Sequence, residues 1–136
     1  MRSIETLRRL ASVAALAVFA VGAVPSAQAG PAPRSAPQCF NLRDWSGWKA
    51  TADGKSIYIR IGVSDLYRLD FGYTCHAATG IGVHLVTRVR GSSFVCSPLD
   101  LDLKVGDGGF ATPCIVSRIT PLSAAEAAAL PKSLRP

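Results

Sequence analysis

The sequence predicts a mainly β domain: a small antiparallel sheet curled into a barrel or sandwich, with a short C-terminal helix. Two observations lead to this prediction. Several segments between positions 56 and 120 alternate apolar and polar residues with the two-residue period of half-buried strands, and glycine-containing turns separate them. The stretches between these segments are too short to hold a crossover helix, so the strands are expected to pair antiparallel.

A cleavable signal peptide is predicted to precede this domain, at residues 1–29. Basic residues open the chain, an uncharged apolar run extends from Leu10 to Val24, and small residues stand at positions 27 and 29. The apolar run is shorter than the roughly 20 residues that span a bilayer, which favours a cleaved leader over a membrane anchor. We therefore expect a periplasmic or secreted protein, exported by the Sec route, with no stable membrane anchor after cleavage.

After the cleavage site, the chain divides into a leader and one domain. Residues 30–38, GPAPRSAPQ, are rich in proline and alanine and predict a flexible leader. Residues 39–136 predict a single disulfide-bonded β domain, because roughly 100 residues have room for one small core.

The clearest strand signals are the segments 56–63 (SIYIRIGV) and 65–71 (DLYRLDF), and the short link between them predicts a hairpin. A third strand is predicted within 80–90, with His84, Arg88 and Arg90 on its polar face. The positions expected to face the core in these strands and the next one are Ile57, Ile59, Ile61, Val63, Tyr67, Leu69, Phe71, Val83, Leu85, Val89, Leu99, Leu101, Leu103 and Val105.

Residues 97–110, SPLDLDLKVGDGGF, raise the question of a calcium loop, because three aspartates lie close to glycines. An EF-hand loop counted from Asp100 needs oxygen ligands at its fifth and twelfth positions. Those positions hold Lys104 and Ala111, so the motif fails. A strand that ends in a glycine turn at 106–109 explains the segment, and PCIVSRIT is expected to form the returning strand. We therefore predict no metal site.

The C-terminal segment predicts a short helix over 124–130. Ser123 and Glu126 have the spacing of a capping box, and Pro131 ends the helix. A helix this short is unstable alone in water, so we expect it to dock on the sheet through Leu122 and Leu130.

The four cysteines, Cys39, Cys75, Cys96 and Cys114, predict two disulfides, since an even count in a short exported domain is typical of them. A zinc site is disfavoured because the chain has no Cys-x-x-Cys pair. Four cysteines allow three connectivities, and the sequence does not decide among them. Our preference is Cys75–Cys96 with Cys39–Cys114, in which one bridge closes a local loop and the other ties the N-terminal segment to the last strand.

Charge and motifs exclude several function classes. The net charge of +6 is scattered without a basic stripe, which argues against a nucleic-acid partner. The chain has no Gly-x-Ser-x-Gly elbow, no phosphate-binding glycine loop and no His-Glu-x-x-His helix, so we predict neither an enzyme nor a cofactor. The alternative is a small envelope enzyme that uses His76 or His84 as a base.

Four residues are candidates for binding a partner. Trp45 and Trp48 lie three positions apart near the start of the domain, and tryptophans stack on sugars or anchor protein partners. Packing at the edge of the core is the competing interpretation for both. Arg88 and Arg90 belong to a polar strand face that suits an acidic partner. We therefore expect a non-enzymatic binding or structural module of the cell envelope, with an envelope protein or a glycan as its partner.

The order of short motifs resembles an uncharacterised family of small exported proteins of Gram-negative bacteria, a family of unknown function. The resemblance covers about residues 39–130. It is carried by CFNLRDWSGWKATADGKSIYIRI, YRLDFGYTC, FVCSPLDLDL and PCIVSRITPLSAAEAAAL. It implies export and an all-β fold, and it implies no activity, cofactor or catalytic residue.

Overall fold

The structure is a computed structural model that describes residues 37–136. The predicted signal peptide and most of the predicted leader lie outside the described residues. The described strands are β1 (Phe40–Asn41), β2 (Trp45–Ala50), β3 (Ser56–Ile61), β4 (Asp65–Phe71), β5 (His84–Val89), β6 (Phe94–Val95), β7 (Leu101–Asp107), β8 (Phe110–Pro113) and β9 (Val116–Pro121). The helices are α1 (Ala124–Ala129) and four 3₁₀ helices, η1 (Leu42–Asp44), η2 (His76–Thr79), η3 (Pro98–Asp100) and η4 (Lys132–Leu134).

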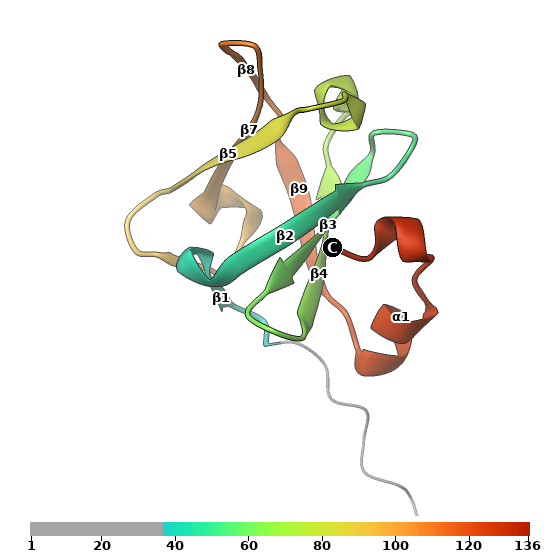
Figure 1. The fold of residues 1–136 in the computed structure, drawn as a ribbon. Helices are drawn as coiled ribbons and strands as arrows, with labels where there is room; N and C mark the ends of the chain where they lie inside the picture. Colours follow the sequence, from blue (N-terminus) through green and yellow to red (C-terminus); the bar gives the residue numbers. More distant parts are fainter. Residues whose placement is uncertain (1–36) are drawn as a thin grey trace, which may run out of the picture. The chain divides into compact units, whose positions relative to one another are not determined.

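The strands form three antiparallel sheets (Figure 1). One has the order β2-β3-β4-β9, the second β5-β7-β8, and the third is the short pair β1-β6. The prediction of a mainly β, antiparallel domain with a short helix is confirmed. The strands do not form the closed barrel that was one of the two predicted forms. The outer strands β2 and β5 belong to different sheets and do not pair with each other.

The core lies between the facing surfaces of the two larger sheets. The predicted hairpin of β3 and β4 is confirmed, with Ile57 opposite Leu69 and Ile59 opposite Tyr67, and these four side chains are fully buried. The other sheet contributes Leu101, Leu103 and Val105 of β7, also buried. Strict alternation places all of them on inward faces, which is why the sequence pattern identified them.

Two positions expected in the core are exposed instead. Val63 is 93% exposed because β3 ends at Ile61 and the chain turns through Gly62, whose φ is +60°. Leu99 is 83% exposed because it lies in η3, before β7 begins at Leu101. In both cases the alternation continued in the sequence beyond the end of the strand.

Of the segment PCIVSRIT, only Pro113 belongs to the ladder beside β7, opposite Lys104. The strand that returns beside β7 is β8, across a turn at Gly108 and Gly109, both with positive φ. After Pro113 the chain leaves this sheet, and β9 pairs with β4 in the other one. The returning strand was therefore predicted in the right sequence region and placed in the wrong sheet.

The C-terminal region covers the outer face of β2, β3 and β4. The predicted capping box is confirmed: the Glu126 N–H donates to the Ser123 hydroxyl, and the Ser123 N–H donates to the Glu126 carboxylate. Leu122 and Leu130 are half-buried and line a hollow between α1 and the sheet. Beyond α1, Pro136 packs against Gly47, and its backbone oxygen accepts a hydrogen bond from Arg60.

Two disulfides are present, as predicted, but their pairing is Cys39–Cys96 and Cys75–Cys114. The preferred pairing was wrong because disulfide partners follow strand pairing, which the sequence did not reveal. Cys39 and Cys96 directly extend the β1–β6 register, in which Phe40 lies opposite Val95. Cys75 follows the end of β4 and Cys114 precedes the start of β9, and those two strand ends are neighbours.

The two disulfides should differ in their accessibility to reductant. Cys39 and Cys96 are exposed, whereas Cys75 and Cys114 are 3% and 0% exposed. We expect limiting dithiothreitol under native conditions to reduce the Cys39–Cys96 bridge first. Alkylation of the released thiols, followed by mass spectrometry of the labelled peptides, measures the order of reduction. Complete reduction should lower the free energy of unfolding by about 2–4 kcal/mol per bridge. Earlier labelling of Cys75 and Cys114 would contradict the burial of that bridge.

Within residues 37–136, the Tyr67 hydroxyl is buried and has no hydrogen-bond partner. The ring packs against Phe40 with centroids 4.8 Å apart, and burial raises the pKa of the phenol. Tyr67→Phe keeps the ring and removes the unsatisfied group, so it should raise the free energy of unfolding by about 1 kcal/mol. Denaturant titration measures this change. A free energy of unfolding lower by about 1 kcal/mol in Tyr67→Phe would show instead that the hydroxyl has a partner.

Candidate functional site

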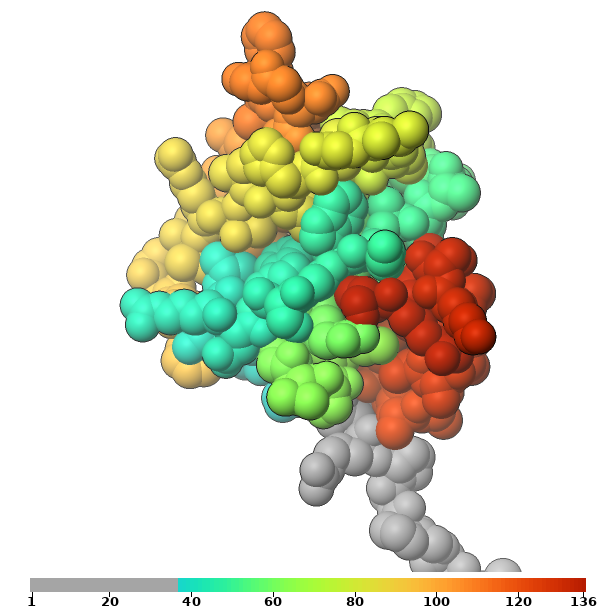
Figure 2. Space-filling model, viewed as in Figure 1, coloured from blue at the N-terminus to red at the C-terminus, as the bar shows by residue number. Residues whose placement is uncertain are grey.

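A groove follows β2 on the side that faces β5. We call it the tryptophan groove and define it by residues 45–52 on one wall and by His84, Leu85, Thr87, Val83 and residues 78–80 on the other. It has two adjoining parts of about 430 and 310 Å³, and Trp48 lines both. In Figures 1 and 2 the yellow β5 lies beside the teal β2.

Both predicted tryptophans line this groove. Trp45 lies opposite Ile61 and Trp48 opposite Ile59, so both side chains are on the inward face of their sheet. Because β2 is the outer strand, no neighbouring strand covers its free side. The indoles are therefore half-buried: they pack against the core and are also exposed to the groove. Packing at the edge of the core is therefore confirmed for both residues, and their role in binding stays a prediction.

The backbone of β2 has free hydrogen-bonding groups on its groove side. In an antiparallel ladder, residues whose N–H and C=O point to the partner strand alternate with residues whose groups point away. The Thr51 N–H donates to the Ser56 oxygen, so the backbone N–H and C=O groups of Thr51 and Lys49 point toward β3. The N–H and C=O groups of Trp48 and Ala50 consequently point into the groove.

The same argument applies to β5. The Arg90 N–H donates to the Asp100 oxygen, so the backbone N–H and C=O groups of Arg90, Arg88 and Val86 point toward β7. The backbone groups of Leu85, Thr87 and Val89 then point away from β7, and Leu85 and Thr87 line the groove. No backbone hydrogen bond joins β2 to β5 within residues 37–136. Two free strand edges thus border one groove.

The ionisable side chains that line the groove are basic. They are Lys49 and His84, both exposed, and no carboxylate lines either part. The His84 ring lies directly over Gly106 on β7, where the Cβ of any larger residue would collide with it. Gly106 therefore has a packing role that its place in the predicted glycine turn did not indicate.

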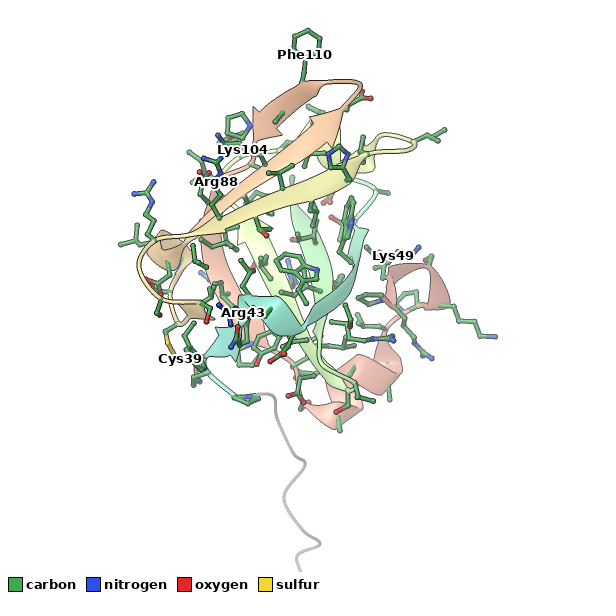
Figure 3. All side chains as sticks on the ribbon, turned by 60° about the vertical axis from the view of Figure 1, so that its left-hand side comes forward. Cys39, Arg43, Lys49, Arg88, Lys104 and Phe110 are labelled. Atoms are coloured by element: carbon green, nitrogen blue, oxygen red, sulfur yellow. A yellow bond between two sulfur atoms is a disulfide. The ribbon has the colours of Figure 1, made fainter. Side chains whose placement is uncertain are left out.

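The two candidate arginines do not join the tryptophans. Arg88 is exposed on the outer face of β5, on the same sheet as Lys104 (Figure 3). Arg90 lies beyond the end of β5 and borders a separate small hollow with Leu99 and Ile115. The structure therefore groups Trp45 and Trp48 with His84 and Thr87 instead.

The histidine hypothesis requires a carboxylate partner. His76 lies in η2 and His84 in β5, and both are exposed. Within residues 37–136, no hydrogen bond or ion pair links either imidazole to a carboxylate. Nor does the described part of the chain contain a group of three or more histidine, cysteine or acidic side chains arranged to hold a metal ion.

Asp100, the first residue of the suspected calcium loop, caps a turn. Its carboxylate accepts hydrogen bonds from the Cys96 N–H at 3.0 Å and the Ser97 N–H at 2.8 Å. These two bonds hold the pKa of the Asp100 carboxyl below its usual value. The carboxylate thus orders the chain between the Cys39–Cys96 bridge and β7.

The lowered pKa of Asp100 predicts a pH-dependent contribution to stability. The contribution is fully present above the unfolded pKa, about 3.9, and is lost as pH falls through the folded pKa. Wild type should exceed Asp100→Asn in melting temperature near pH 7, and the difference should shrink below about pH 4. Differential scanning calorimetry across this range tests it, and a pH-independent difference would contradict the role of the charge.

Sequence reasoning did not place the second wall of the groove beside the tryptophans. Thr87 carries no motif, and its position follows from the pairing of β5 with β7, which brings a distant segment beside β2. The tryptophans and His84 were visible in the sequence, but His84 was named only as a candidate base.

Comparison with known proteins identified no relative: no family model, curated protein or solved structure matches this chain. The resemblance to an uncharacterised exported family therefore stays a prediction. Among the described residues, no helix is long and apolar enough to cross a membrane.

Proposed function

We propose that this protein is a non-enzymatic binding module of the cell envelope and that its partner occupies the tryptophan groove. The observation that carries the proposal is the position of Trp45 and Trp48, two half-buried indoles that line a groove bordered by two unpaired strand edges. Indoles give large contact areas at a small cost in side-chain entropy, which makes them frequent anchors in binding sites.

The compartment proposed for this function agrees with the cysteine chemistry. Two disulfides and no free cysteine among residues 37–136 fit an oxidising extracytoplasmic environment. Export by the predicted signal peptide would place the domain among envelope proteins and glycans. The alternative of a histidine-based enzyme has weaker support, because the groove that contains His84 has no carboxylate to orient the ring.

The proposal predicts that Trp48→Ala removes partner binding. Disulfide-bonded wild-type protein, Trp48→Ala and the control Phe110→Ala are immobilised, and the envelope extract of the producing cells and purified peptidoglycan are passed over each. Phe110 is the matched control because it is aromatic, 85% exposed and far from the groove, at the projecting tip of the β7–β8 hairpin (Figure 3).

We expect retention by wild type and Phe110→Ala, and a reduction of about tenfold or more with Trp48→Ala, since truncation of an anchor residue costs 2 kcal/mol or more. Circular dichroism confirms that each variant is folded, because Trp48 also packs on the core. Equal retention by all three proteins, or retention by none, would contradict the proposed function.

A further inference from the structure

We propose that the occupant of the tryptophan groove is an extended, neutral or acidic polypeptide segment of a partner protein, which pairs through its backbone with the free edges of β2 and β5. This inference rests on the proposed function and specifies the chemistry of its ligand. Addition of a strand to an exposed sheet edge is an established mode of peptide recognition, in which main-chain hydrogen bonds supply affinity.

The first support is the hydrogen-bonding capacity of the groove. Trp48 and Ala50 on β2, and Leu85 and Thr87 on β5, direct their backbone groups toward it, as derived from the two ladder registers. An extended peptide presents donors and acceptors on both of its edges. One inserted strand would therefore serve both walls and would join the two larger sheets.

The second support is length. β2 and β5 have six residues each, and at about 3.3 Å per residue each edge is roughly 20 Å long. The groove follows β2 from Trp45 to residue 52; β5 borders the part along residues 45–48, and Val83 with residues 78–80 borders the rest. An extended segment of similar length would lie along β2 through both parts, with Trp48 where they meet.

The third support is the state of the hydroxyl groups, which argues against a glycan. The Ser46 hydroxyl donates to the Gly62 oxygen at 3.0 Å, and the Thr51 hydroxyl donates to the Asp53 carboxylate at 2.6 Å. The Thr79 hydroxyl donates to the His76 oxygen at 2.9 Å. Three of the four hydroxyl side chains that line the groove therefore already donate their protons within the domain, the fourth being Thr87. These three hydroxyls have no proton left to donate to a sugar.

The charge of the groove selects the kind of peptide. Lys49 and His84 are its ionisable lining residues, and no carboxylate lines it. An acidic or neutral segment complements them, and a basic one would be repelled. The predicted leader of this chain is a poor occupant, because its prolines at 31, 33 and 37 have no N–H to donate and Arg34 is basic.

The test uses a phage-displayed library of random linear peptides, selected against the disulfide-bonded protein. Selected peptides are synthesised in three forms: unmodified, N-methylated at the odd-numbered residues and N-methylated at the even-numbered residues. Each methylation removes backbone donors on one edge of the peptide and keeps every side chain. We expect selected sequences to be neutral or acidic, and we expect N-methylation of either set to weaken binding by about tenfold or more, because one set pairs with β2 and the other with β5.

Two substitutions at Thr87 form the matched pair on the protein side. Thr87→Pro removes an N–H that faces the groove and leaves the β7 ladder intact, and proline is tolerated on an edge strand. Thr87→Val keeps the N–H and the side-chain volume and removes the hydroxyl. Binding should be lost with Thr87→Pro and retained with Thr87→Val. If Thr87→Pro fails to fold, the N-methylated peptides still decide the question.

The outcomes separate this inference from the proposed function. If peptides bind through Trp48 but neither N-methylation nor Thr87→Pro weakens their binding, strand pairing is overturned and the binding function stands. The same conclusion follows if no peptide is selected while an N-acetylglucosamine tetramer, or the envelope extract, binds through Trp48. A dimer in light scattering that Thr87→Pro converts to monomer makes a second copy the occupant and overturns the inference. Failure of every probe to bind through Trp48 overturns both.

Discussion

The arrangement of the two larger sheets depends on Cys114. Its N–H donates to the Leu103 oxygen on β7, and its sulfur is bonded to Cys75, which follows β4. The residue is fully buried and lies between β8, which belongs to one sheet, and β9, which belongs to the other. One residue therefore fixes both sheets at the corner where the chain crosses between them, and a buried disulfide makes that corner costly to open.

The opposite side of the structure has no such connection. β2 and β5 are the outer strands there, and no ladder or disulfide joins them in residues 37–136. An open edge is a hazard for a soluble protein, since it presents unpaired backbone groups to other chains. Here Trp45 and Trp48 of β2 pack against the core, and Pro136 packs on Gly47 of the same strand. The groove that remains is a strand edge with defined walls, which is the basis for the proposed function.

The sequence predicted local structure well and long-range pairing poorly. Strand faces such as Ile57, Ile59 and Tyr67 could be identified because a two-residue period reports which side is buried. The cap at Ser123 was identified because its partner lies three residues away. Disulfide connectivity and the partner of β9 depend on which strands meet, and local patterns carry no information about that. The site followed the same rule: Trp45 and Trp48 were visible as a motif, whereas Thr87 became part of the groove only through the fold.

Residue-resolved amide hydrogen exchange of the free protein tests the central claim, that β2 and β5 border the groove as unpaired edges. The account predicts alternating protection: slow exchange at Lys49, Val86 and Arg88, and fast exchange at Trp48, Ala50, Leu85 and Thr87. Exchange at these groove-facing amides should slow when a selected peptide is bound. Uniformly slow exchange along both strands of the free protein would contradict the account, because it would mean that β2 and β5 already pair and that the sheet is closed.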